Sequence, residues 1–474
     1  MPPASPASKP RFESLWLALP LAAYILLPTH NYYWDGISAA INAEKHLPPR
    51  DILFPTHLVY TLVHTWLFRA ALAVGLRVRS LYIMQFVNSL LAAACAPLVC
   101  RALDRRLGDR PAAIAGALVF AFSATWWRFA SDANSYIPAV FFVLCALDCI
   151  ETGRNPILGG LANAAAMLFH ELAILFLPFA LFRLKNRRQA LLYLTSSMLP
   201  VAAAYLAAYR SVSDTFTAAG FVRWVVAAPP IGAGHFSFQP LHDLVWTLLG
   251  TGRLFFGGKL DALRALPAAS AIVLTVLVAL IVWRLRRTGA ARFATPPLDL
   301  VLWLAVYVVF LFFWLPENTF YRMFYLAPLV LIICASFPRA GLLGAALFVC
   351  NGLLVIYPAS RVENNVPLRF ALQQYNHWPT GTPIAFSIFH SDLWTIAYFN
   401  PQVSWVGMPR IDIPVLDRAY DEARGRGQPM WLEATAYDAL KADPAGRGWL
   451  QSHPVANLLR FRDGKHEFTF YQLQ

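Results

Sequence analysis

The chain has 474 residues, of which 58% are hydrophobic and only 14% are charged. A soluble domain has about a quarter of its residues charged, so this composition excludes an ordinary soluble protein and indicates an integral membrane protein. The net charge of +13 resides in short clusters between apolar runs, at 101–110 (the first basic cluster), 183–188 (the second) and 284–292. Such clusters are typical of cytoplasmic loops, and we expect no nucleic-acid partner.

Apolar runs follow one another from residue 12 to residue 357. A transmembrane helix needs roughly 20 apolar residues. The clear candidates are 12–28, 80–100, 111–127, 134–150, 190–209, 267–285, 298–315, 320–337 and 340–357. Two further runs are ambiguous, because 55–76 carries His57, His64 and Arg69 and 157–182 is interrupted by His170-Glu171, and charged groups at the bilayer centre are costly.

The two ambiguous runs decide the topology together. If each spans the membrane once, the first basic cluster lies outside, against the positive-inside rule. If the first run lies in the outer interface and the second is a pair of short helices meeting at His170, both basic clusters lie inside. We expect this second arrangement. It gives about eleven spans by the same length criterion and places Asp35, Asp132 and His170 on one side of the membrane.

The predicted fold is mainly α. Residues 1–357 are expected to form a polytopic helical bundle, with 29–79 as a first outer loop and 211–266 as a later outer segment. Residues 358–474 alternate short apolar segments with helix-like ones, which predicts a small extracytoplasmic α/β domain.

The C-terminal domain has its own pattern of elements. The predicted strands are 382–388, 403–407 and 430–434, and the predicted helices are 414–425 and 434–441. A hairpin is expected at the end of the chain, with Asp463-Gly464 supplying the positive φ angles that its turn needs.

The clearest candidate for chemistry is Asp35, in the stretch from Asn31 to Tyr60. It follows Tyr32, Tyr33 and Trp34, aromatic residues suited to a membrane interface. Asp35 is either a cap for a helix at 36–43 or an acid/base group.

A second carboxylate favours the acid/base alternative. Asp132 stands at the predicted outer end of the third span. Near Asp35 it would position a basic phosphate ligand, hold a divalent cation or raise the pKa of Asp35. A solvated loop acid or a helix cap is the alternative for Asp132.

Further polar residues interrupt the apolar runs. His170 and Glu171 form either a functional pair or a polar helix junction. Tyr321 and Arg322 belong to a polar patch at an outer helix end, where the arginine either pairs with a lipid phosphate or snorkels to ordinary headgroups. Arg79 and Arg128 carry the same two interpretations.

The early acidic residue, the second acidic motif about a hundred residues later and the late segment from Tyr321-Arg322 through Pro328 resemble lipid-carrier-dependent glycosyltransferases of the GT-C superfamily. This group includes protein O-mannosyltransferases, the lipid A aminoarabinose transferase and oligosaccharyltransferases. The resemblance covers residues 12–357 as organisation, and it implies juxtamembrane helices in the first outer loop. Asp35 matches the early catalytic aspartate and Asp132 the second-loop acid, while Arg322 matches the late arginine.

The sequence also departs from part of this group. Gly36 follows Asp35 where the mannosyltransferases have a glutamate, and Phe-Pro-Thr-His at 54–57 replaces their Pro-Pro-Leu signature. A strict assignment as a protein O-mannosyltransferase is therefore not supported.

The resemblance implies transfer of a sugar from a polyprenyl-phosphate carrier to an acceptor hydroxyl at the outer face of the membrane. Asp35 would be the general base, and direct displacement would invert the anomeric carbon. The residues expected to bind the carrier phosphate or substrate are Arg322, His170, Glu171, Arg79, Arg128, His57 and Tyr321.

The expected partners are the polyprenyl-phosphate-linked sugar donor, membrane lipids and an acceptor glycan, lipid or protein. No cofactor is implied, and a divalent cation at the carboxylates is left open as an alternative. The Ala/Arg-rich composition favours a bacterial inner membrane, with the active site and the C-terminal domain extracytoplasmic.

Two other classes of protein remain to be compared. A transporter or flippase of a lipid-linked sugar would show repeated halves and charged groups at mid-membrane, whereas the acids here gather at one surface and no repeat is visible. A structural protein would need no such gathering of acids. The sequence therefore favours a transferase.

Overall fold

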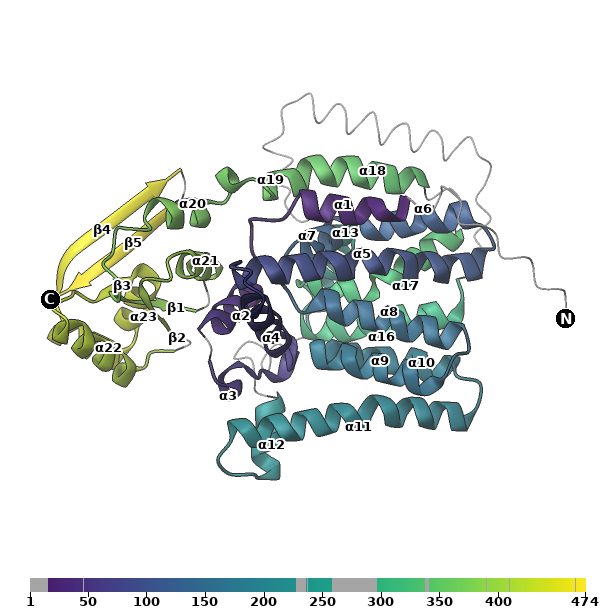
Figure 1. Cartoon of the computed structure of the whole chain (residues 1–474), viewed down its shortest axis with the longest axis horizontal. Helices are drawn as coiled ribbons and strands as arrows, with labels where there is room; N and C mark the ends of the chain where they lie inside the picture. The colour runs from purple at the N-terminus through teal and green to yellow at the C-terminus, as the bar shows by residue number, and fades with distance from the viewer. Residues whose placement is uncertain are drawn as a thin grey trace. The chain divides into compact units, whose positions relative to one another are not determined.

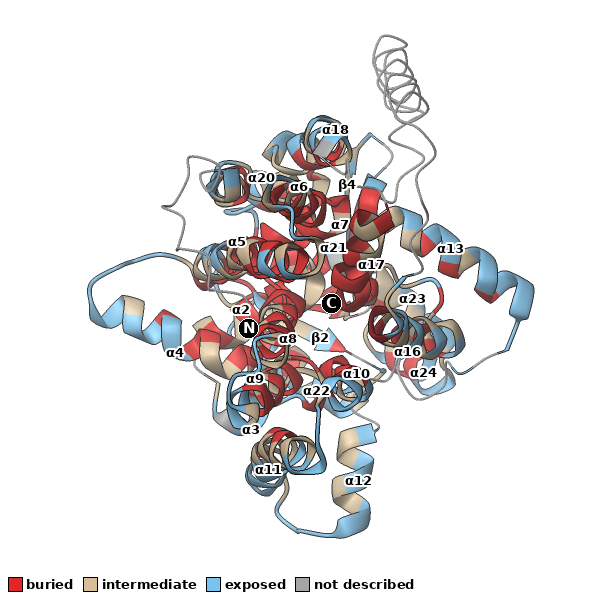
Figure 2. Ribbon diagram, turned by 90° about the vertical axis from the view of Figure 1, so that its right-hand side faces the viewer, coloured by how far each residue is buried: buried red, intermediate tan, exposed pale blue. Residues whose placement is uncertain are grey.

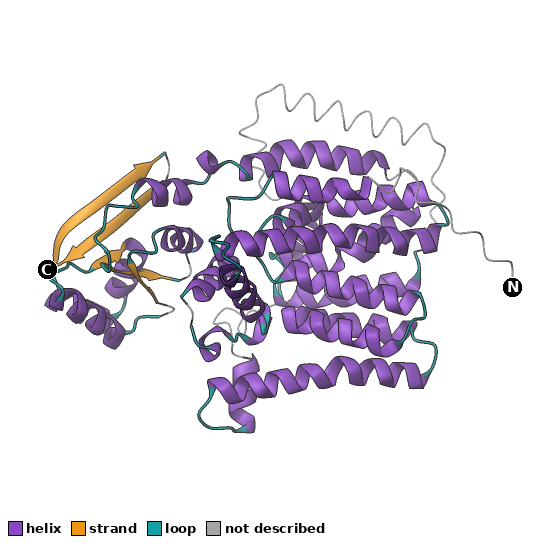
Figure 3. Ribbon diagram, viewed as in Figure 1, coloured by secondary structure: helices purple, strands orange, loops and turns teal. Residues whose placement is uncertain are grey.

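The computed structural model of the chain describes residues 16–45, 47–226, 236, 238–257, 296–336, 341–388, 390–408, 410–464 and 466–474. The chain divides into two compact units. The helical unit comprises Met1–Thr29 and Asn42–Ser360, and the α/β unit comprises His30–Ile41 and Arg361–Gln474. Helices make up the helical unit, while the described strands all belong to the α/β unit (Figure 3). The mainly helical fold with a small C-terminal α/β unit confirms the predicted class.

The described elements of the helical unit are all helices (Figure 1). They are α1 (Leu19–Leu26), α3 (Pro49–Ile52), η2 (Pro55–His57), α4 (Tyr60–Ala73), α5 (Ser80–Leu107), α6 (Arg110–Ala121), α7 (Ala124–Ala130), α8 (Tyr136–Glu151), α9 (Pro156–Phe169), η3 (Glu171–Phe176), α10 (Leu177–Arg183), α11 (Arg187–Val212), α12 (Ala218–Val226), α13 (Pro240–Phe256), α16 (Leu298–Trp314), η4 (Phe320–Arg322), α17 (Met323–Ser336), α18 (Gly341–Asn351), η5 (Gly352–Ile356) and α19 (Tyr357–Ala359). Helix α2 (Trp34–Glu44) begins in the α/β unit and ends in the helical unit.

Among the described residues, three helices are long and apolar enough to cross a membrane: Ser80–Leu107, Arg187–Val212 and Leu342–Ala359. A fourth is added if α6 and α7, bent by 70° at their junction, form one span. These helices and the composition identify an integral membrane protein. The total of about eleven spans stays a prediction, and the expected span at 267–285 lies outside the described residues.

The helices differ in how far they are enclosed by protein. In the apolar stretch of α5, 61% of the residues are buried, against 17% in α11. Buried positions dominate the inner helices α5, α8 and α17, whereas α11 and α13 carry mostly intermediate and exposed positions (Figure 2). The exposed positions of α11 include Leu191 and Leu199. Apolar side chains turned outward are stable in hydrocarbon, so α11 has the character of a lipid-facing helix.

One end of the helical bundle is held by ion pairs, and we call it the ionic end. Arg106 Nη2 at the end of α5 lies 2.6 Å from Glu151 Oε1 and 3.0 Å from Asp299 Oδ2. Arg183 Nε at the end of α10 lies 3.6 Å from the same Asp299 oxygen. The first basic cluster and the start of the second therefore lie at the same end of the bundle.

The first predicted outer loop begins and ends at the end of the bundle opposite the ionic end. Gln85, near the start of α5, donates through Nε2 to the Thr29 carbonyl at 2.9 Å and to the Ser131 carbonyl at 3.1 Å. Helix α5 has 28 residues and is therefore about 42 Å long, which separates these contacts from the ionic end. The ambiguous run 55–76 thus forms η2 and α4 without crossing the bundle.

The second ambiguous run folds back on itself. Helix α9 leads away from the ionic end to Phe169, the backbone turns at His170, and η3 with α10 returns to Arg183. Tyr307 fixes the returning arm by donating its hydroxyl to the Leu172 carbonyl at 3.0 Å. A pair of short helices meeting at His170 is the arrangement that brings both basic clusters to one end.

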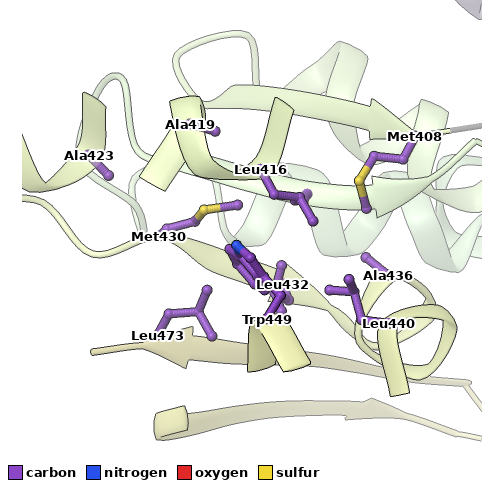
Figure 4. Close-up of a cluster of buried hydrophobic side chains, with 11 residues drawn as sticks. Met408, Leu416, Ala419, Ala423, Met430, Leu432, Ala436, Leu440, Trp449 and Leu473 are labelled. Carbon is purple, nitrogen blue, oxygen red and sulfur yellow. The ribbon is translucent and has the colours of Figure 1, made fainter. Parts of the chain in front are cut away.

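The α/β unit contains a five-stranded mixed sheet. Its remaining elements are η6 (Val362–Asn364), α20 (Val366–Gln373), β1 (Pro383–Ser387), α21 (Ser391–Phe399), β2 (Ser404–Met408), α22 (Ile413–Gly425), β3 (Trp431–Glu433), α23 (Ala434–Ala442), α24 (Pro444–Ser452), β4 (Val455–Asp463) and β5 (His466–Leu473). The strand order is β2-β1-β3-β5-β4, with β1 parallel to β2 and β3, and β5 antiparallel to β3 and β4. Helix α22 packs on the sheet through Leu416, Ala419 and Ala423 (Figure 4).

The predicted strands and helices of this unit lie within two residues of the observed ones. The predicted hairpin is present, but its turn is shifted by one residue. Asp463 still pairs with His466 in the ladder, and its carboxylate binds Arg369 at 2.5 Å. The loop therefore begins at Gly464, whose φ of +60° a glycine adopts without steric cost.

Candidate functional site

Asp35 lies in the first turn of α2, which begins at Trp34. The aspartate is inside the helix, so it does not occupy the capping position that was the alternative for it. Its half-buried carboxyl group loses hydration, and this burial raises the pKa of Asp35 to about 7, while a hydrogen bond with the Tyr33 side chain acts in the opposite direction. A carboxyl group with a pKa near neutrality is suited to accepting a proton at physiological pH.

The start of α2 is fixed within the α/β unit. Tyr32 stacks on Phe399 with a ring separation of 5.7 Å. The His30 carbonyl accepts a hydrogen bond from Asn365 Nδ2. Both contacts join the residues just before α2 to segments more than three hundred positions later. They explain why Asp35 belongs to the α/β unit although the sequence assigns it to the first outer loop of the membrane domain.

Asp132 lies in the helical unit, in the turn between α7 and α8. It is only 2% exposed, which excludes a solvated loop acid. Its Oδ1 accepts from the Ala133 amide at 2.8 Å, and its charge interacts with Arg128 at the end of α7. The Ile137 amide, in the first turn of α8, donates instead to Asn134 Oδ1 at 3.1 Å. Asp132 therefore supports a half-buried arginine at the end of the bundle opposite the ionic end.

Several predicted site residues meet around the turn at His170. The His170 ring lies 4.8 Å from Tyr136, 5.6 Å from Tyr321 and 5.4 Å from Phe324, measured between ring centroids. Tyr321 stacks in turn on Trp314 at 5.3 Å with an interplanar angle of 11°. We call these five residues the aromatic cluster. Sequence reasoning missed Tyr136 and Trp314, although Tyr136 follows the Asp132 motif directly.

His57 and Glu171 extend this cluster on its polar side. Element η2, which contains His57, packs against η3, which begins at Glu171 directly after His170. Tyr205 of α11 donates its hydroxyl to the Pro55 carbonyl at the start of η2. Element η2 is thereby anchored beside the His170 turn. His57, His170, Glu171 and Tyr321 thus form one neighbourhood, which their sequence positions did not reveal.

Arg322 is fully buried, with 0% exposure. Its guanidinium donates from Nη1 to the Tyr325 hydroxyl at 2.9 Å and from Nη2 to the carbonyls of Pro316 and Trp246. No carboxylate in the described ranges forms an ion pair with it, and its Nε atom has no hydrogen-bond acceptor among them. The arginine packs against α13 and does not snorkel to lipid headgroups; it is also closed to solvent in this conformation.

Arg79 has a local role in the helical unit. Its Nε lies 2.9 Å from Glu44 Oε2, and Glu44 Oε1 accepts from the Ser80 amide at 2.8 Å. Glu44 thus accepts the hydrogen bond of the Ser80 amide at the start of α5 and compensates the charge of Arg79. Within the described ranges, no group of three or more potential metal-ligating side chains is present.

No protein-family model matches the sequence, and no curated protein matches it. The fold, however, is similar to the crystal structure of ArnT from Cupriavidus metallidurans bound to undecaprenyl phosphate. The TM-score is 0.61 at 10% sequence identity, over 97% of this chain and 97% of that chain. ArnT from the same organism in the apo state gives a TM-score of 0.45 at 13% identity, and the fold assignment rests on the first comparison. The fold that the sequence resemblance implied is thereby confirmed.

Proposed function

We propose that the chain is a membrane-embedded glycosyltransferase that moves a sugar from a polyprenyl-phosphate carrier to an acceptor hydroxyl. The observation that carries this proposal is the likeness of the whole fold to ArnT, a protein solved with undecaprenyl phosphate bound. The likeness extends over 97% of both chains, so it includes the helical unit and the C-terminal unit together. A glycosyltransferase with its site at the outer face of a bacterial inner membrane agrees with this organisation.

Asp35 is the proposed general base. The acceptor hydroxyl attacks the anomeric carbon of the donor sugar, its proton passes to the Asp35 carboxylate, and the bond from that carbon to the carrier phosphate breaks. A direct displacement of this kind inverts the anomeric configuration. The raised pKa of Asp35, about 7, supports this role because proton transfer is most effective when the pKa of the base lies near the operating pH.

The departing phosphate requires positive charge held in advance. Arg128 is half-buried and supported by Asp132, so we propose it as the phosphate ligand and Asp132 as the residue that positions it. Arg322 is fully enclosed by carbonyl groups and would act on the phosphate only after a rearrangement. His57, His170, Glu171 and Tyr321 are proposed substrate-contacting residues at the same end of the bundle.

The test is a transfer assay with the full-length chain in lipid nanodiscs and a panel of polyprenyl-phosphate sugars, with and without a chelator. We expect transfer from at least one donor and loss of at least about a hundredfold in the Asp35→Asn variant, the lower bound for losing a general base. Asp51→Asn is the matched control, because Asp51 lies in the same predicted outer loop, is half-exposed and, among the described residues, forms an ion pair with Arg50 alone. Transfer by Asp35→Asn at the wild-type rate would remove Asp35 from the mechanism, and retained configuration in the product would exclude direct displacement.

A further inference from the structure

The α/β unit contains a cleft of about 170 Å³ beside α22, at the amino ends of β1 and β2. Pro383 and Ser404, which pair in the register of these strands, stand at its edge. The apolar side chains that line it include Val406, Val415 and Ala419. The volume lies below the range of drug-sized pockets, so the cleft suits a single ring and not an extended chain.

The rim of the cleft carries three charged residues of α22 and its end: Arg418, Glu422 and Arg426. They are spaced by four positions, which places them on the same face of a helix. Glu422 and Arg426 form an exposed ion pair at 3.5 Å. In the part of the chain that the structure describes, Arg418 has neither an ion pair nor a hydrogen bond. The rim therefore has one uncompensated positive charge, and it belongs to Arg418.

The wall opposite α22 is fixed before any ligand arrives. Arg426 Nη1 donates to the Gly381 carbonyl at 3.4 Å, and Gln428 Nε2 donates to the Thr380 carbonyl at 3.0 Å. The Gly381 amide donates to the Gln402 carbonyl at 2.8 Å. Gly381 has a φ of +83°, which glycine adopts at no steric cost. A cleft with walls that are already ordered loses less conformational entropy on binding.

We propose that this cleft binds a monosaccharide-sized ligand that carries a phosphate or carboxylate group. The anionic group binds the guanidinium of Arg418, whose planar donors match two oxygens of either anion. The C–H face of the ring rests on Val406, Val415 and Ala419. The cleft lies within the α/β unit, and binding there is independent of the transfer reaction proposed above.

The experiment uses the full-length chain in nanodiscs and isothermal titration calorimetry. The probes are inorganic phosphate, glucose 6-phosphate and glucuronate, with glucose as the neutral reference. We expect glucose 6-phosphate or glucuronate to bind more tightly than both inorganic phosphate and glucose, because only these two probes use the charged rim and the apolar side chains together. Comparing glucose 6-phosphate with glucuronate distinguishes a phosphate ligand from a carboxylate ligand.

Three variants localise the binding. Arg418→Gln should weaken it about tenfold, the value of one charge-assisted contact, whereas Glu422→Gln should strengthen it by removing a neighbouring negative charge. Arg424→Gln is the matched control, because Arg424 is equally exposed on the same helix and lies outside the cleft. Absence of binding by all charged probes, or equal affinities of the Arg418→Gln and Arg424→Gln variants, would overturn the proposal.

Discussion

The guanidinium of Arg322 lies against Gly250, and its Nε atom occupies the space that a Cβ atom on Gly250 would need. The Cζ and Nη2 atoms of the same guanidinium lie at 2.9 Å and 3.0 Å from the position of that Cβ atom. The absence of a side chain at Gly250 is therefore what admits the arginine against α13, where its Nη2 reaches the Trp246 carbonyl one turn earlier. Helix α13 and the η4 turn are joined through this contact.

We expect the Gly250→Ala variant to be less stable than the wild type by about 1–3 kcal/mol, the usual cost of overpacking. The new methyl group would displace the guanidinium from its carbonyl acceptors inside the protein. The measurement is the thermal unfolding midpoint in detergent. Gly252→Ala is the matched control, because nothing lies within 4 Å of a Cβ there and alanine is favoured over glycine in a helix by about 0.5–1 kcal/mol. Equal effects of the two changes would contradict this account.

The pH dependence of the transfer rate should follow the ionisation of the Asp35 carboxyl group. Its pKa of about 7 means that the carboxylate form gains population as the pH rises through 7. We expect the transfer rate to increase over this range and then to level off. Tyr33→Phe removes the hydrogen bond that lowers this pKa, so the profile should move to higher pH. A rate that is constant from pH 5 to pH 8, or that falls as the pH rises through 7, would show that Asp35 is not the base.

The same group also predicts a pH-dependent stability. Because the folded pKa of Asp35 is raised above the ordinary value of 3.8, the folded state binds more protons than the unfolded state between these values. The stability of the wild-type protein relative to the Asp35→Asn variant therefore falls as the pH rises from about 4 to about 7. Asp35→Asn should raise the unfolding midpoint at pH 8 but not at pH 4. A midpoint difference that does not change with pH would contradict a raised pKa.

The ion pairs at the ionic end should contribute measurably to stability. Asp299 is 6% exposed and binds both Arg106 and Arg183. We expect Asp299→Asn to cost about 1.5–3 kcal/mol, the range for hydrogen bonds to charged groups. Asp104→Asn removes a pair at 3.3 Å with both side chains 38% exposed, and such pairs are worth at most about 1 kcal/mol. The unfolding midpoint of the Asp299→Asn variant should therefore be lower than that of the Asp104→Asn variant.

Labelling from the two sides of the membrane tests the topology. Single cysteines introduced as Arg154→Cys and Lys185→Cys should react with a membrane-impermeant maleimide from one side, because α9 starts at the ionic end and α10 returns to it. Leu76→Cys, at an exposed position after α4, should react from the other side. If 55–76 and 157–182 each crossed the membrane once, Leu76→Cys and Lys185→Cys would react from the same side, and Arg154→Cys from the opposite one.

The sequence by itself determined the class of protein and the local elements. Apolar runs and basic clusters are recorded in the order of residues, so the membrane character, the position of α5 and the strands β1 to β3 follow from hydrophobic pattern and length. The positions of the basic clusters also showed which of two membrane topologies obeys the positive-inside rule. The turn at Gly464 was placed within one residue, because only glycine among its neighbours accepts a positive φ easily.

Only the tertiary structure decided which residues are neighbours. Asp35 belongs to the α/β unit through contacts of Tyr32 and Asn365 with residues far along the chain, and no local pattern encodes such pairings. The aromatic cluster joins His170 to Tyr136 and Trp314 in the same way. Whether Arg322 meets lipid or protein depended on a missing side chain at Gly250, more than seventy positions away. Burial and contact are properties of packing between distant segments, whereas hydrophobic periodicity reports only on each segment and its immediate surroundings.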